Sequence, residues 1–251
     1  MKTLKLDDIL KFCDNLLDSS SFKDASFNGL QVENTKEISK IVTGVSATKE
    51  LFERAKKAKA DLVITHHGLF WKGADPRLVG VLGNRVKALG NMSLMAYHLP
   101  LDAHKTIGNN AKIAQFIEAE VKGYFPVDRP DSISIKASYE QSKDADYIVS
   151  NLKKVIPDSN IRVIGDNRPI KNMVICSGEG AFNIDMDLTN IDAVITGEMT
   201  ERYYHLAFEK NINIILLGHH YSEVFGIIAL GEKIKEKFGA EVEFIDVFSP
   251  F

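Results

Sequence analysis

The sequence predicts an α/β protein built from two similar lobes. Three observations support this prediction: short β-branched runs alternate with amphipathic stretches, polar residues follow several of these runs directly, and one run recurs in the second half of the chain. Alternating strands and helices are typical of a largely parallel sheet that is covered on both faces. Ligands bind such sheets at the carboxyl ends of the strands, so the polar residues there predict a functional site.

The first lobe is predicted as residues 1–125. Its first helix is expected at residues 6–17, where apolar side chains lie on one side and charged side chains on the other. Thr48 is a predicted N-cap for the second helix. The strands of this lobe are expected at 38–45, 62–64 and 93–97, and its further helices at 46–59, 78–89 and 109–120.

The second lobe is predicted as residues 126–251, because prolines, aromatics and charges break the pattern near residues 123–130. The glycine-rich turn at 178–180 lacks the spacing of a P-loop or a dinucleotide fingerprint. The strands of this lobe are expected at 133–135, 161–164, 173–177, 192–196, 212–217 and 242–247, and its helices at 144–155, 202–210 and 224–238.

Two adjacent histidines, His66 and His67, follow the apolar run that begins at Leu62. Successive side chains of an extended chain point to opposite sides. Neighbouring imidazoles therefore reach one ion with difficulty, but they easily bind one each of two ions lying side by side. The pair indicates a dinuclear metal centre. In the alternative, one histidine is a hydrogen-bonded core residue and the other belongs to a surface loop, since histidine needs no metal to be satisfied.

The run Asp192–Glu198 repeats the run Asp61–His67 almost residue for residue. Each half later has a strand followed by histidine, three residues and an acid, at His98–Asp102 and at His219–Glu223. The shared order of the two motifs predicts an internal duplication. If the lobes pack with their strand ends facing, the polar clusters meet in the cleft between them.

Imidazoles and carboxylates at strand ends are the predicted metal ligands: His66, His67, Asp102, His219 and Glu223. Nitrogen and oxygen ligands without thiolate suit two divalent ions per subunit, and iron, zinc, manganese and nickel all remain open. Each acid alone also fits a structural role, as a turn residue or as a partner of a helix dipole. Glu223 is expected in the first turn of the last helix. The roles of His104, His205 and His220 stay open.

The composition excludes several classes of protein. A net charge of -3 and a pI near 6.2 give no basic excess, so the bulk charge does not indicate nucleic acid as a partner. Cys13 and Cys176 are far apart, which indicates neither a disulfide framework nor a thiolate zinc site. The N-terminal residues include acids where a signal peptide needs an apolar core, and no apolar stretch is long enough to cross a bilayer. A cytoplasmic protein without a membrane partner is expected.

The chain resembles the Nif-three-like proteins, the GTP cyclohydrolase 1 type 2 homologues, in five segments: 28–31, 65–71, 97–104, 196–198 and 218–223. The resemblance spans essentially the whole chain. It implies two similar α/β lobes with a dinuclear metal site, a toroidal homohexamer, and metal-ligand roles for the five residues named above. The length leaves no room for the extra domain that some members insert. Where many members have Trp-Asp-Asn-x-Gly-Leu-Gln, this chain has Ala25-Ser26-Phe27-Asn28-Gly29-Leu30-Gln31, so a role for the missing acid is not carried over.

The leading expectation is a metal-dependent hydrolase in which two ions activate water and polarise the substrate. A nucleotide or a phosphoester is the expected substrate class, and the family label suggests ring opening of GTP. Glu198 and His98 are the predicted catalytic residues, as carriers of protons. The alternative is a non-catalytic, metal-binding adaptor or regulatory protein with protein or nucleic-acid partners.

Overall fold

The computed structural model describes residues 3–126, 132–166 and 168–250. The chain folds into two compact units. The first runs to Leu101 and takes in Gly226–Phe248, and the second is Asp102–Phe225 with the residues after Phe248. Helix α8 (His219–Phe238) therefore begins in the second unit and ends in the first.

The boundaries of the two units differ from the predicted division at residue 125. Strand β7 (Glu120–Phe125) pairs with β8 (Ser134–Lys143), so residues just before 125 belong to the second unit's sheet. Strand β13 (Glu241–Phe244) pairs with β4 (Lys40–Ser46), so the end of the chain returns to the first unit. Of the stretch 123–130 that suggested the division, residues 127–130 lie outside the described residues.

The first unit is built on a five-stranded sheet in the order β13-β4-β5-β6-β2. The strands β13, β4, β5 and β6 run parallel, and β2 is antiparallel to β6. A separate two-stranded ribbon joins β1 to β3. The bounds of the strands not yet given are β1 Leu4–Lys5, β2 Gly29–Val32, β3 Glu37–Ile38, β5 Leu62–His67 and β6 Ser93–Ala96.

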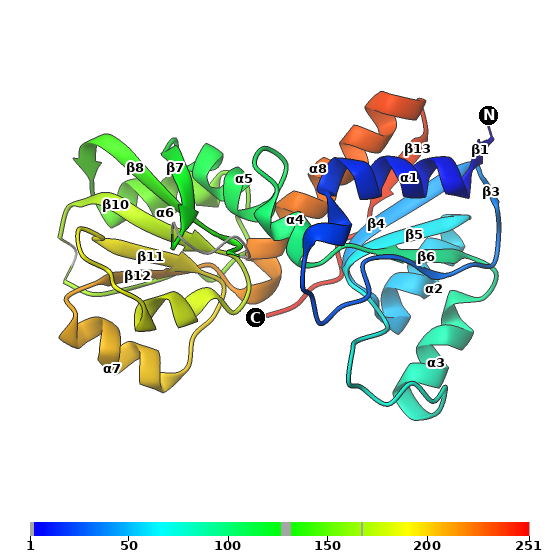
Figure 1. Ribbon diagram of the computed structural model, residues 1–251, viewed down its shortest axis with the longest axis horizontal. Coiled ribbons are helices and arrows are strands. Elements are labelled where there is room, and N and C mark those ends of the chain that lie inside the picture. The colour runs from blue at the N-terminus through cyan, green and yellow to red at the C-terminus, as the bar shows by residue number, and fades with distance from the viewer. Residues whose placement is uncertain (1–2, 127–131, 167, 251) are drawn as a thin grey trace. The chain divides into compact units, whose positions relative to one another are not determined.

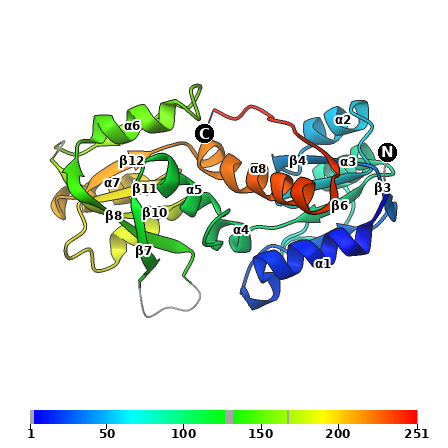
Figure 2. The ribbon, with the colours of Figure 1, turned by 90° about the horizontal axis from the view of Figure 1, so that it is seen from above.

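Helices cover both faces of this first sheet (Figure 1). On one face, α2 (Lys49–Lys57) and α3 (Gly80–Leu89) enclose a core of apolar side chains from the strands and the two helices. On the other face lie α1 (Leu6–Leu17) and the later part of α8 (Figure 2). The rings of Phe12 and Phe238 on these two helices meet edge to face, with their centroids 5.4 Å apart. A sheet buried on both faces explains why its strands read as continuous apolar runs.

The second unit has a six-stranded sheet in the order β7-β8-β10-β11-β12-β9. Its three central strands, β10, β11 and β12, run parallel, while β8 and β9 are antiparallel to their neighbours. The core on one face is closed by η2 and α7, and α5 packs against β8 and β10. The remaining bounds are η1 Ser19–Ser21 of the first unit, α4 Leu99–Ala103, α5 Asn109–Phe116, α6 Ala145–Lys153, β9 Arg162–Ile164, β10 Ile170–Cys176, η2 Gly180–Asp185, β11 Ala193–Thr196, α7 Glu201–Glu209 and β12 Asn213–Leu216.

Local signals placed most elements well. The helix predicted at residues 6–17 is confirmed, and Thr48 caps α2 by accepting the backbone N–H of Leu51 at 3.1 Å. The helix predicted to reach residue 120 ends at Phe116, because the chain turns at Glu118 with a φ of 60° and then enters β7. Among the described residues, no helix combines the length and apolarity that crossing a membrane requires.

The start of the last helix corrects one expectation. Helix α8 begins at His219 rather than near residue 224, because Gly218, with a φ of 89°, turns the chain directly from β12 into the helix. Glu223 is therefore the fifth residue of α8 and does not lie in its first turn. Its carboxylate is placed by α8 and is not held at the helix N-terminus.

Candidate metal centre

Three histidines of the first unit gather at the carboxyl ends of neighbouring parallel strands. His66 and His67 are the last residues of β5, and His98 follows the end of β6 by two residues. Each of the three offers a ligand nitrogen, and these atoms lie within 4.8 Å of one another. The first unit therefore holds a group of imidazoles that can bind a metal ion.

The first two imidazoles are oriented through their Nδ1 atoms. Nδ1 of the buried His66 lies 3.0 Å from the carbonyl oxygen of Tyr97. A carbonyl only accepts, so this nitrogen carries the hydrogen and the lone pair lies on Nε2, the atom that could bind a metal ion. Nδ1 of His67 lies 3.0 Å from Oγ of Ser46 on the neighbouring strand β4. Contacts of this kind fix the tautomer and the ring orientation of metal-binding histidines.

The third imidazole, His98, contacts a carboxylate that sequence reasoning missed. Its Nδ1 lies 2.8 Å from Oδ1 of Asp24, whose side chain is only 2% exposed. Burial alone would raise the pKa of the Asp24 carboxyl. Hydrogen bonds from His98, Asn28 and the backbone of Ser26, together with the electrostatic interaction with His98, outweigh burial and hold this pKa well below its usual range. Asp24 therefore stays ionised beside the ring.

The Asn-Gly-Leu-Gln segment braces the histidine cluster. The side chain of Asn28 donates to Asp24 at 3.0 Å and accepts the backbone N–H of His98 at 2.8 Å. Oε1 of Gln31 accepts the backbone N–H groups of Leu69 and Phe70, at 2.8 and 3.2 Å, and so holds the loop that follows His67. These motif residues position the ligand-bearing segments of the first unit.

The second unit places a histidine between two carboxylates. Nε2 of His219 lies 3.2 Å from Oε2 of Glu223, and its Nδ1 lies 3.1 Å from Oε1 of Glu198. Burial lowers the pKa of the His219 imidazole, but the hydrogen bonds and charges of Glu223 and Glu198 outweigh burial and raise it to about 9. Without a metal this cluster therefore holds a proton, which a cation bound at the same atoms would displace.

A glycine makes room for this cluster. Gly178 follows β10 with a φ of 59°, and a Cβ atom there would lie 2.4 Å from Oε1 of Glu223 and 3.4 Å from Nε2 of His219. The N–H of Gly178 donates to Oγ of Ser222 at 2.9 Å. The glycine-rich turn at 178–180 thus allows the backbone to approach the Glu223 carboxylate closely.

Asp102 is held by neutral donors from its own unit. Its Oδ1 accepts hydrogen bonds from Oγ of Ser177 at 2.6 Å and from Nδ2 of Asn109 at 2.8 Å, and the residue is buried. Buried carboxylates that accept hydrogen bonds from neutral donors suit a divalent cation.

The other histidines lie in different settings. His104 closes its own turn, because its Nδ1 accepts the backbone N–H groups of Thr106 and Ile107 at 3.2 Å. His205 is exposed on α7, with Nε2 3.7 Å from Glu201. His220 is buried, and its ring meets the Tyr221 ring edge to face.

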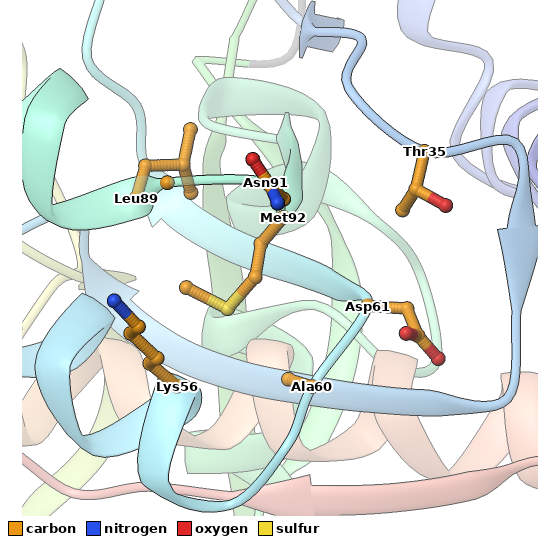
Figure 3. Close-up of a pocket in the computed structure, with 8 residues that line it drawn as sticks. Thr35, Lys56, Ala60, Asp61, Leu89, Asn91 and Met92 are labelled. Atoms are coloured by element: carbon orange, nitrogen blue, oxygen red, sulfur yellow. The ribbon is translucent and has the colours of Figure 1, made fainter.

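A pocket opens at the opposite ends of the first unit's strands (Figure 3). It has a volume of about 320 Å³ and lies where β5 and β6 begin, with Asp61 and Met92 in its wall and Lys56 contributed by α2. Because the histidines stand at the carboxyl ends of the same strands, this pocket is not part of the histidine cluster.

The fold and the site define a class: an α/β protein that gathers histidines and carboxylates at the carboxyl ends of parallel strands. The chain belongs to the family described as Duf34/NIF3 (NGG1p interacting factor 3), whose model matches residues 4–250. This match confirms the family resemblance stated from the sequence.

Relatives cover the whole chain. A protein of Pasteurella multocida named GTP cyclohydrolase 1 type 2 homolog is 38% identical over 100% of both chains, and one of the same name from Archaeoglobus fulgidus is 36% identical over 97% of this chain and 98% of its own. Among solved structures, the protein ybgI, described as of unknown function, has a TM-score of 0.91 at 33% identity and covers 99% of this chain and 100% of its own. Its structure confirms the mixed α/β fold.

Proposed function

We propose that the protein is a dinuclear metal-dependent hydrolase and that its two divalent ions are bound by His66, His67, Asp102, His219 and Glu223. The observation that carries the proposal is that the donor side chains are already oriented and buried. His66 presents Nε2 because the carbonyl of Tyr97 occupies its Nδ1, and Glu223 and Asp102 are buried carboxylates. That one centre draws ligands from both units is part of the proposal and rests on the sequence.

The donor set fits divalent transition metals. Imidazole nitrogens with carboxylate oxygens suit iron, zinc, manganese and nickel. When bound, such ions supply Lewis-acid chemistry, polarising a carbonyl or phosphoryl oxygen and lowering the pKa of water from roughly 15.7 to about 7.

The chain's own residues would manage the protons. His98 keeps Nε2 toward the histidine cluster, since its Nδ1 faces Asp24, and in this proposal it accepts a proton from the attacking water. Glu198 is half-exposed and contacts Nδ1 of His219. We assign to Glu198 the exchange of protons between His219 and solvent.

Two features shared by the sheets of the two units support an internal duplication. The strand order β4-β5-β6-β2 of the first sheet has the same pattern of directions as β10-β11-β12-β9 of the second. Asp61 accepts two consecutive backbone N–H groups where β4 begins, at 2.7 and 3.0 Å, and Asp192 accepts two consecutive backbone N–H groups of β10, at 2.9 and 2.8 Å. We propose that the two units arose from one ancestral α/β lobe.

The proposed substrates are nucleotides or other phosphoesters, and GTP is the first to test because relatives carry the name GTP cyclohydrolase 1 type 2 homolog. From the family resemblance we further propose a toroidal homohexamer in the cytoplasm. No part of the proposal involves a membrane.

Turnover on a panel of nucleotides and phosphoesters tests the proposed activity. The metal-free protein and samples reloaded with Mn²⁺, Zn²⁺, Fe²⁺ or Ni²⁺ are compared with Glu223→Gln and with His205→Ala, which changes an exposed histidine away from the site. We expect turnover only in reloaded wild type and His205→Ala. Absence of turnover in fully loaded wild type across the panel would contradict the hydrolase proposal and favour a metal-binding adaptor.

A further inference from the structure

Asp24 is a buried carboxylate whose hydrogen bonds are arranged largely without His98. Its Oδ1 accepts the backbone N–H of Ser26 at 2.9 Å, and its Oδ2 accepts the backbone N–H of Leu99 at 2.9 Å and Nδ2 of Asn28 at 3.0 Å. Three donors therefore hold the carboxylate in place before the imidazole is considered. Two backbone N–H groups and the Asn28 amide therefore hold this carboxylate in addition to the ring.

The fourth contact of Asp24, with His98, determines which ring nitrogen of His98 carries the hydrogen. Oδ1 of Asp24 lies 2.8 Å from Nδ1 of His98. An ionised carboxylate only accepts hydrogen bonds, so Nδ1 carries the hydrogen and the neutral ring keeps a lone pair on Nε2. The opposite tautomer would set a nitrogen lone pair against a carboxylate oxygen.

The ring of His98 is also fixed in direction. Its backbone N–H donates to Asn28, and Trp71 packs against the ring edge to face, with centroids 5.0 Å apart. Its centroid lies 5.1 Å from that of His66 and 5.6 Å from that of His67. A ring held in this way aims its Nε2 at the place where the other two imidazoles gather.

We propose that Asp24 is a positioning residue that locks His98 in the Nδ1–H tautomer and directs the Nε2 lone pair into the histidine cluster. The use of that lone pair rests on the proposed metal function, whereas the tautomer itself does not. Carboxylates behind the histidines of metal sites act in this manner, and their replacement typically costs about 10-fold to 100-fold in metal affinity.

The tautomer can be read in the full-length, metal-free protein by NMR of ¹⁵N-labelled histidine near pH 8, with His98→Gln to assign the signal. We expect hydrogen on Nδ1 in the wild type. In Asp24→Asn the side-chain amide can donate to Nδ1, so we expect the hydrogen to move to Nε2. The matched control is Asp61→Asn, because Asp61 also accepts two backbone N–H groups in the first unit but lies at the end of β5 opposite to the histidines.

Titration with Co²⁺ gives the second readout. We expect affinity about 10-fold to 100-fold lower in Asp24→Asn than in Asp61→Asn. Hydrogen on Nε2 of His98 in the wild type would overturn the proposal even if Asp24→Asn failed to fold, and so would an unchanged tautomer in a folded variant. If the wild type binds no Co²⁺, the dinuclear proposal fails, and the tautomer still decides the role of Asp24.

Discussion

Replacing Gly178 by alanine should displace the carboxylate of Glu223, a proposed metal ligand, and weaken metal binding beyond any loss of stability. The new Cβ would stand 2.4 Å from Oε1 of Glu223, about 1 Å inside ordinary contact. The carboxylate is the end of a side chain, so it moves and the backbone stays. Metal–ligand distances in well-formed sites lie within about 0.2 Å of their usual values, so a shift of about 1 Å would take the carboxylate out of range. We therefore expect metal affinity to fall by at least the roughly 10-fold to 100-fold that follows loss of an outer-shell contact.

The matched control is Gly239→Ala. Gly239 has a φ of 66°, close to the 59° of Gly178, but a Cβ there would meet nothing within 4 Å. Both variants place alanine in the left-handed region, which costs about 1–2 kcal/mol. Urea unfolding of the metal-free proteins should show this similar loss, and Co²⁺ titration should separate them. Equal Co²⁺ affinity in the two variants would refute the inference that Gly178 makes room for a ligating Glu223.

Three further predictions concern the proposed metal ligands and the residues that position them. Ser177→Ala removes the 2.6 Å hydrogen bond to Asp102 and should weaken Co²⁺ binding about 10-fold to 100-fold, while an unchanged titration would show that this contact is dispensable. The pKa of His219 is raised from 6.5 to about 9, so its protonation should stabilise the metal-free protein fully below pH 6.5, and this stabilisation should be lost as the pH rises through 9. Urea unfolding between pH 6 and 10 should show the loss. In Glu223→Gln the change in stability over this pH range should be smaller. Gln31→Ala removes the acceptor of two backbone N–H groups in the loop after β5. Hydrogen exchange at those two amides should become faster, and the free energy of unfolding should fall by about 1–3 kcal/mol. Unaltered exchange would argue against the role of Gln31 in holding this loop.

Much of the architecture could be predicted because it is locally encoded. The apolar runs, the helix at residues 6–17 and the Thr48 cap depend on neighbouring residues. The division into units could not, because it depends on pairings between distant segments such as β13 with β4.

The histidines at strand ends were predictable for a similar reason, since a run such as Leu62–His67 shows both the strand and where it ends. Asp24 was not, because it lies 74 residues from His98 and no local pattern links them.

The repeated motif also carried an ambiguity that the sequence could not resolve. Backbone hydrogen bonds join Tyr97 to Thr65 and Leu217 to Thr196, both at 2.9 Å, and these pairs align the two sheets. In that alignment His98 corresponds to Gly218, so the two histidine-to-acid spacings are one residue out of register. The similarity of the second motif in the two halves therefore reflects the strand-to-helix turn more than matched ligands.

The central claim is tested most directly by counting metal ions per chain. Elemental analysis of protein purified without added metal is normalised to folded protein and compared with His67→Ala, Glu223→Ala and the surface control His205→Ala. The account predicts about two ions per chain in the wild type and the control, and fewer in both site variants. No metal in any sample, with none taken up on reconstitution, would contradict it.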